Sequence, residues 1–135
     1  MFKNDGMLVQ EYEYDFAVDG GAQGTIDLSA KANKDPLPAG AIPVECYAEV
    51  VTAVTSAGAL TLSWGNGSAN DVDGYSGVAK AVGALLLDTV FDGKADSGAL
   101  LGVTKLAAGE GPVSVTIGAA DATAGKVKFR VVYVY

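Results

Sequence analysis

The chain has 135 residues, of which half are hydrophobic and 19% are charged, and its formal net charge is −7. This composition predicts one folded domain and excludes a disordered chain, because enough apolar residues are present to fill a core. The acidic balance argues against a nucleic-acid partner, which clustered Lys and Arg would have to bind, and the single cysteine, Cys46, excludes an intrachain disulfide.

Two strands are predicted near the N-terminus. Residues 8–18 carry apolar side chains at most even positions and acidic side chains at odd ones, which is the period of two of a half-buried strand. A glycine-rich turn ends this strand at residues 19–21, and a short strand follows at residues 25–28. Two prolines then mark residues 31–40 as a loop, because proline removes a backbone donor and restricts φ.

The longest predicted strand lies in the middle of the chain. Residues 42–55 are rich in β-branched side chains and alternate between an apolar face, which includes Cys46, and a mixed face. After a turn at residues 56–58, residues 60–64 alternate again. Two alternating runs joined by a short turn predict a β-hairpin. The polar residues 65–77 then predict a loop.

The last third of the chain predicts weak elements followed by two clear strands. A short helical turn is expected before a strand near residues 85–91, and a weak strand near residues 100–106. Residues 113–117 alternate strictly, the segment 118–125 reverses the chain, and residues 126–135 alternate to the C-terminus. The final strand is therefore expected to be built into a sheet.

Three cations occupy alternate positions of that final strand: Lys126, Lys128 and Arg130. Alternate residues of a strand lie on one face. We expect these side chains to form a solvated face that prevents unwanted strand pairing, and contact with an acidic partner is the alternative.

These elements predict an all-β, mainly antiparallel fold. Seven or eight short strands joined by Gly-rich turns, with at most one short helix, fit a β-sandwich or jelly roll. Residues 8–135 are expected to form this single domain, and residues 1–7 an N-terminal arm. The N-terminus lacks the apolar stretch of a signal peptide and no run approaches the ~20 apolar residues of a membrane span, so we expect synthesis in a cytoplasm and no membrane contact.

The residue types present predict that the protein is not an enzyme. The sequence contains no histidine, which removes Ser-His-Asp and Cys-His catalysis and imidazole metal sites. Cys46 lies in an apolar strand and is expected to be a core residue rather than a nucleophile. Acidic pairs such as Glu11 and Glu13 are expected on solvated strand faces. We predict no catalytic residue and no cofactor.

The acidic loop at residues 70–74 carries clustered oxygen ligands of the kind that Ca²⁺ prefers in an EF-hand. With Gly74 at the sixth place, Ala69 and Lys80 occupy the first and twelfth places, so the pattern fails. A calcium site assembled from separate loops stays open as an alternative, while an Asn/Asp/Gly turn explains the segment without an ion. No metal site is therefore predicted.

Aromatic residues are concentrated in the first and last predicted strands. They are Tyr12, Tyr14 and Phe16 at one end of the sequence, and Phe129, Tyr133 and Tyr135 at the other. Such side chains suit a core or a subunit interface. Phe2 lies in the predicted arm, which could become ordered on a partner.

Three segments of the sequence resemble a known family. They are YDFAVDGGAQGTIDLS (14–29), LPAGAIPVECYAEVVTAVTSAGALTLSWG (37–65) and GPVSVTIGAADATAGKVKFRVVYVY (111–135), and they resemble small virion structural proteins of tailed bacteriophages, particularly head decoration or cement proteins. The resemblance implies a β-sandwich or jelly-roll module without a cofactor. It also implies binding to the major capsid protein on the outer surface of the assembled capsid, often as a trimer, after synthesis in the host cytoplasm.

If the resemblance holds, the N-terminal arm and first strand are the expected contact with capsid or sibling subunits, through Phe2, Met7, Tyr12, Tyr14 and Phe16. Another virion role, in a tail or head fibre, is the second candidate function. A carbohydrate-binding or adhesion module is a third, because Trp64 and Tyr75 flank a polar loop and aromatic rings stack on sugars.

Overall fold

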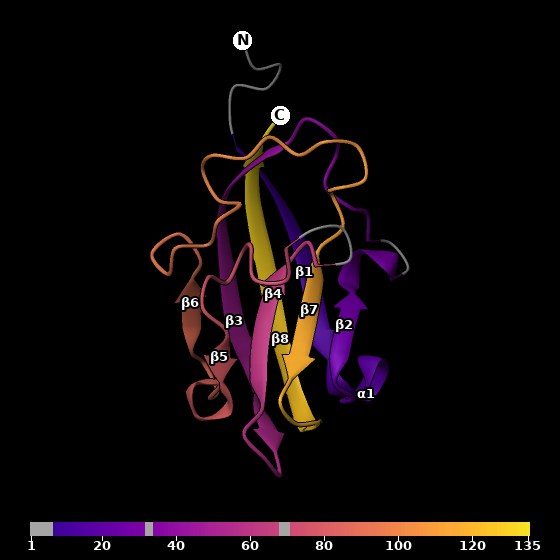
Figure 1. Ribbon diagram of the computed structural model, residues 1–135, viewed down its shortest axis with the longest axis vertical. Helices are drawn as coiled ribbons and strands as arrows, with labels where there is room; N and C mark the ends of the chain where they lie inside the picture. The colour runs from indigo at the N-terminus through magenta and orange to yellow at the C-terminus, as the bar shows by residue number, and fades with distance from the viewer. Residues whose placement is uncertain (1–6, 32–33, 68–70) are drawn as a thin grey trace.

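The computed structural model describes residues 7–31, 34–67 and 71–135. Two four-stranded antiparallel sheets pack face to face (Figure 1). Sheet A has the strand order β1-β8-β3-β6 and sheet B the order β2-β7-β4-β5. The strands are β1 (Leu8–Asp15), β2 (Gly24–Asp27), β3 (Ile42–Ser56), β4 (Thr61–Gly65), β5 (Lys80–Ala81), β6 (Val90–Asp92), β7 (Ser114–Gly118) and β8 (Ala122–Val134). The predicted all-β sandwich is confirmed.

The strand order is that of a two-stranded ribbon rolled up on itself. β1 pairs with β8, β2 with β7, β3 with β6 and β4 with β5, and every connection except the one between β4 and β5 crosses from one sheet to the other. Eight antiparallel strands in two such sheets form a jelly roll. As a result, the first and last strands are neighbours, and the start of β1 and the end of β8 lie at the same end of the molecule (Figure 1).

The predicted hairpin of residues 42–55 and 60–64 is wrong. β3 belongs to sheet A, where it lies between β8 and β6, and β4 belongs to sheet B, where it lies between β7 and β5. Both edges of β3 are therefore occupied by strands distant in sequence. The short turn carries the chain across the sandwich, so β3 and β4 contribute apolar side chains to one core from opposite sheets.

Helical turns occupy little of the chain: α1 (Phe16–Asp19) and the 3₁₀ turns η1 (Leu28–Ala30) and η2 (Val82–Ala84). The first strand ends earlier than predicted because Asp15 caps α1, its Oδ1 accepting a hydrogen bond from the Ala17 N–H at 3.0 Å. Among the described residues, no helix has the length and apolar character to cross a membrane.

The structure also differs from two of the weaker strand predictions. The strand expected near residues 85–91 begins only at Val90, since residues 86–89 form a turn in which Asp88 has a φ of +65°. The strand expected near residues 100–106 is a series of turns. Backbone hydrogen bonds tie this segment to other parts of the chain: the Gly102 N–H bonds to the Pro43 carbonyl on β3 and the Leu106 N–H bonds to the Ala41 carbonyl.

The core lies between the sheets and has an aromatic centre. Trp64 on β4 is tilted against Phe129 on β8 and Phe91 on β6, with ring centroids 5.2 and 5.7 Å away. Tyr12 and Tyr14 of β1 are also fully buried. Burial of such large side chains from both sheets is the main source of stability in a fold without disulfides.

Buried tyrosines make the stability of this core sensitive to alkaline pH. The Tyr14 O–H donates a hydrogen bond to the Gly20 carbonyl at 2.8 Å, and burial raises the pKa of Tyr14 from 10.0 to about 12. Burial also raises the pKa of Tyr12 and of Tyr75. Because these pKa values are higher in the folded protein, the unfolded chain releases its phenolic protons first. The stability that these tyrosines contribute is therefore fully present below the unfolded pKa of 10.0. This contribution is lost as the pH rises through the pKa values of the folded protein.

We expect the free energy of unfolding to fall as the pH is raised from about 9 to about 11.5. Urea unfolding followed by tryptophan fluorescence would measure this fall. In a Tyr14→Phe variant the fall should be smaller. At neutral pH this variant should be less stable by about 1 kcal/mol, because it lacks the hydrogen bond of the Tyr14 hydroxyl. An equal fall in both proteins would contradict a contribution from Tyr14.

Candidate interaction surface

The structure places the five residues of the predicted interface in different environments. Phe2 lies outside the described residues. Tyr12 and Tyr14 are fully buried, and their hydroxyls donate hydrogen bonds to the backbone carbonyls of Asp35 and Gly20. Phe16 is half-buried at the start of α1 and packs against the core. Met7 is 60% exposed. The two tyrosines therefore serve the core, and Met7 is the member of the set most available to a partner.

The outer face of sheet A carries a charged network across three strands. Two lysines of β8 pair with β1: the Lys126 ammonium nitrogen lies 3.6 Å from an Asp15 carboxylate oxygen, and that of Lys128 lies 3.8 Å from a Glu11 carboxylate oxygen. The Arg130 guanidinium, also on β8, lies 3.3 Å from carboxylate oxygens of both Glu11 and Glu49. The three cations lie on a partly solvated face, as expected, but they do not prevent strand pairing, because β8 is paired on both sides by β1 and β3. Their acidic partners come from the same chain, so the face is largely self-neutralised.

An apolar patch adjoins this charged network where β1 begins and β8 ends. Val9 is 58% exposed and lies opposite the half-buried Val132 in the sheet register. Met7 precedes β1, and the half-buried Val134 ends β8. These four side chains, called here the terminal patch, form an apolar surface of the kind that marks protein contacts.

A second apolar surface lies at the opposite lateral edge of the sandwich, beside β6. Leu86, Leu87 and Val90, called here the edge loop, are all exposed. Backbone hydrogen bonds hold this turn in place, because the Asp88 N–H bonds to the Val50 carbonyl at 2.9 Å and the Val50 N–H bonds to the Thr89 carbonyl at 2.9 Å. The exposed leucines are thus presented by ordered backbone.

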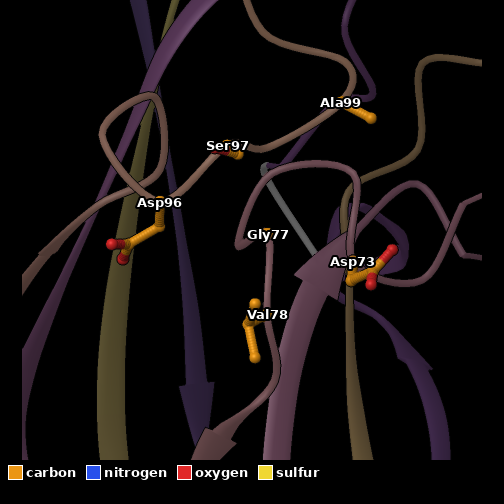
Figure 2. Close-up of a pocket in the computed structure, with 6 residues that line it drawn as sticks. All are labelled: Asp73, Gly77, Val78, Asp96, Ser97 and Ala99. Carbon is orange, nitrogen blue, oxygen red and sulfur yellow. The ribbon is translucent and has the colours of Figure 1, made fainter.

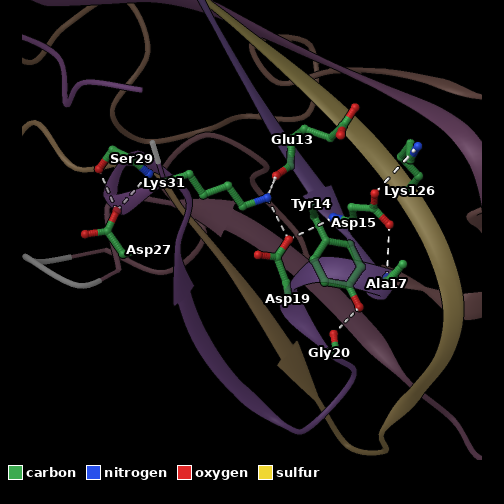
Figure 3. Close-up of polar contacts among 10 residues, drawn as sticks. All are labelled: Glu13, Tyr14, Asp15, Ala17, Asp19, Gly20, Asp27, Ser29, Lys31 and Lys126. Carbon is green, nitrogen blue, oxygen red and sulfur yellow. Dashed lines mark hydrogen bonds and ion pairs between the residues drawn. The ribbon is translucent and has the colours of Figure 1, made fainter. Parts of the chain in front are cut away.

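A group of polar contacts closes one half of the β1 edge (Figure 3). The Asp19 carboxylate accepts a hydrogen bond from the Asp15 N–H at 2.9 Å and binds the Lys31 ammonium at 2.7 Å. The same ammonium donates a hydrogen bond to the Glu13 carbonyl. Figure 3 shows Lys31 reaching β1 from the side opposite Lys126. Asp19 and Lys31, called here the edge plug, occupy backbone groups that a further strand would otherwise use.

A shallow pocket of about 200 Å³ lies among the loops that follow β4 and β6 (Figure 2), and its lining includes Asp73 and Asp96. The two carboxylates point away from each other across the Gly77–Val78 segment (Figure 2). Asp96 is also paired with Lys80 at 2.8 Å. This arrangement does not assemble the facing acid and base that glycoside hydrolysis requires.

Two pairs of carboxyl groups share a hydrogen bond, one beside β6 and one that includes the pocket residue Asp73. Burial and a hydrogen bond to Asp92 raise the pKa of Glu45, while that hydrogen bond lowers the pKa of Asp92. In the acidic loop, a hydrogen bond that the Asp73 carboxyl donates to Asp71 raises the pKa of Asp73. Within residues 7–31, 34–67 and 71–135, no three carboxylate or thiol side chains are arranged to hold a metal ion.

Three further residues singled out in the sequence are core residues. Trp64 and Tyr75, which suggested a sugar site, are both buried, so neither ring is available to stack on a sugar. Cys46 is fully buried, and burial raises the pKa of its thiol. Its predicted place as a small core residue is confirmed.

Sequence reasoning missed the edge plug and the exposed Val9. Asp19 and Lys31 are twelve positions apart, with no local pattern that links them, so only the folded chain brings them together. Val9 did leave a signal, because it is an apolar residue at an odd position in a strand whose other odd positions are acidic.

Comparison with known proteins gives matches only at the level of structure. No protein-family model matches the sequence, and no curated protein is similar to it in sequence. A chain of the cyanophage Pam1 capsid asymmetric unit aligns with a TM-score of 0.57 and 24% identity over 95% of this chain and 84% of that one.

Two other phage capsid structures contain similar chains. A chain in the acidic stable capsid of the Helicobacter pylori bacteriophage KHP30 aligns with a TM-score of 0.59 and 16% identity over 100% of this chain and 92% of that one. A chain in the capsid of Ralstonia phage GP4 aligns with a TM-score of 0.58 and 21% identity over 96% and 84%. At these identities the likeness establishes a shared fold.

Proposed function

We propose that this protein is a structural component of a phage capsid, a decoration or cement protein that binds the outer surface of the assembled capsid and stabilises it. The observation that carries the proposal is the match, over nearly the whole chain, to the fold of chains in three phage capsid structures. The sequence resemblance to decoration proteins points the same way. The partner is the major capsid protein, and the protein is located on the virion surface after synthesis in the host cytoplasm.

The surface chemistry supports adhesion rather than catalysis. The charges of sheet A are neutralised within the chain, and the pocket carboxylates point apart. Two ordered apolar surfaces, the terminal patch and the edge loop, remain exposed. Exposed apolar surface bordered by polar residues is typical of protein interaction sites.

Cementing follows from binding to a lattice. A protein that binds the assembled capsid but not its free subunits adds its binding free energy to the stability of the assembly. The resemblance implies a trimer, which would contact several identical capsid sites at once. Such multivalency can raise the overall affinity by ~10² to 10⁴ over that of one site.

We expect purified protein mixed with undecorated capsids of its own phage to raise the capsid mass by a fixed ratio and to raise the capsid melting temperature. Analytical ultracentrifugation and thermal denaturation would measure the two effects. A mass ratio that keeps rising without saturation, or an unchanged melting temperature, would contradict the cement role. Binding to isolated tails but not to capsids would instead favour a tail or fibre component.

Two variants separate the candidate contact surfaces. Deleting residues 1–6 tests the predicted arm, and the double substitution Leu86→Ser and Leu87→Ser tests the edge loop. We expect the deletion to weaken capsid binding about tenfold or more. Val103→Ser is a matched control, because Val103 is exposed and belongs to neither surface. If binding survives the deletion but is lost with the leucines, the contact lies at the edge loop.

A further inference from the structure

Among the described residues, β1 is an edge strand of sheet A, and β8 is its one strand partner. The Asp15 N–H bonds to Asp19, so it points away from β8. Backbone groups of a strand alternate in direction along an antiparallel ladder. The N–H and C=O groups of Val9 and Glu11, at the same parity as Asp15, therefore also point away from β8.

The edge plug covers only part of this edge. Asp19 and Lys31 occupy the outward groups of Asp15 and Glu13. Apart from the β1–β8 ladder, neither Val9 nor Glu11 has a backbone hydrogen bond to any described residue. Within the part of the chain that the structure describes, no strand pairs with the outer edge from Met7 to Glu11, and such an open edge is a template for an added strand.

We propose that this open segment pairs antiparallel with the same segment of a second copy of the chain, about a twofold axis at Val9. In this register Val9 faces the partner's Val9, and the two exchange both backbone hydrogen bonds. Glu11 and Met7 pair in the same way with the partner's Met7 and the partner's Glu11. The outward backbone groups of this segment then all have partners, because each odd residue, whose N–H and C=O point outward, lies opposite an odd residue of the second copy.

Side-chain chemistry favours a second copy and this register. The exposed Val9 side chains of the two copies cover each other, and the two terminal patches join into one apolar strip. Each Glu11 lies opposite a methionine. The two Glu11 carboxylates are then separated by about 13 Å along the strands, whereas a register centred on Gln10 would bring them closer.

The edge plug sets the length of this contact. A register shifted further along β1 would place the partner strand against Glu13 and Asp15, whose outward groups are already bonded. A contact of five residues is small beside standard interfaces of about 1,600 Å², so the dimer should be weak. Each copy uses one surface for this contact. If the chain also forms trimers, the contact lies between two trimers.

Cysteine crosslinking tests the register. The Cα atoms of a hydrogen-bonded antiparallel pair lie about 5.5 Å apart, so Val9→Cys should give a covalent dimer with a short thiol crosslinker at high protein concentration. Glu11→Cys is the matched control on the same strand and should give none. Cys46 is fully buried and does not compete. Absence of the Val9→Cys dimer, or equal yields from both variants, overturns the proposal.

Sedimentation of the free protein gives a second readout. The apparent mass of the unaltered chain should rise with concentration, and Val9→Lys, which puts two charges face to face, should lose that rise. A rise that persists in Val9→Lys overturns the proposal. Hydrogen exchange gives another contrary outcome: the Val9 and Glu11 amides could be protected with capsids present and unprotected in the free protein. That result also overturns the proposal, because the edge would then pair with a strand of the capsid. None of the measurements on free protein depends on capsid binding.

Discussion

Replacing Trp64 with alanine is expected to lower the free energy of unfolding by about 3–5 kcal/mol. The indole is 1% exposed and contacts the rings of Phe129 and Phe91, so its removal leaves a cavity between the two sheets. Its N–H has no hydrogen-bond partner among the described residues. Trp64 therefore stabilises the protein through packing. The expected loss is a large fraction of the about 5–15 kcal/mol that is typical for the free energy of unfolding of native proteins.

Urea unfolding followed by circular dichroism would measure this loss, since the variant has no tryptophan fluorescence. Tyr47→Ala is a suitable control: Tyr47 is an aromatic residue of sheet A that is 41% exposed and points away from the core. We expect its substitution to cost less than about 1 kcal/mol. Similar losses in both variants would show that Trp64 is not central to the packing between the sheets.

Replacing Lys31 with methionine is expected to cost about 2–3 kcal/mol and to lengthen the open edge of β1. The substitution leaves the Asp19 carboxylate, which is 7% exposed, without its cation, and an uncompensated charge at that depth is costly. It also frees the Glu13 carbonyl. The longer edge should increase self-association, because more outward backbone groups become available.

Thermal unfolding and light scattering would measure the two effects of this substitution. Lys128→Met is the matched control, since Lys128 lies 3.8 Å from Glu11 on the exposed face of sheet A. Such a surface ion pair contributes about 0–1 kcal/mol. If the two lysine variants unfold at the same temperature and scatter equally, the edge plug has neither of the proposed roles.

The candidate surfaces were only partly predictable from the sequence. The exposure of Met7 could be expected from its place just before the first strand. Val9 could have been recognised as an apolar residue on an acidic strand face. Tyr12 and Tyr14 suit a core as well as an interface, because a buried aromatic residue looks the same in sequence whichever surface covers it. Their hydrogen bonds to the Asp35 and Gly20 carbonyls, visible only in the folded chain, assign them to the core.

The all-β class and the positions of the long strands follow from the residue pattern alone. Alternation is a local property: successive side chains of a strand point to opposite faces, so β3, β7 and β8 could be recognised within a few residues of their bounds. The absence of histidine likewise removed imidazole chemistry without any knowledge of the fold.

Strand pairing, in contrast, is a property of the folded chain. A short turn after β3 is compatible with a hairpin in one sheet and with a crossing to the other, since the local backbone geometry does not distinguish them. The choice depends on partners far along the chain: β8 and β6 occupy both edges of β3, and β8 also lies beside β1. The free half of the β1 edge and the plug that closes the other half follow from that pairing, because an edge exists only when the neighbours of a strand are known.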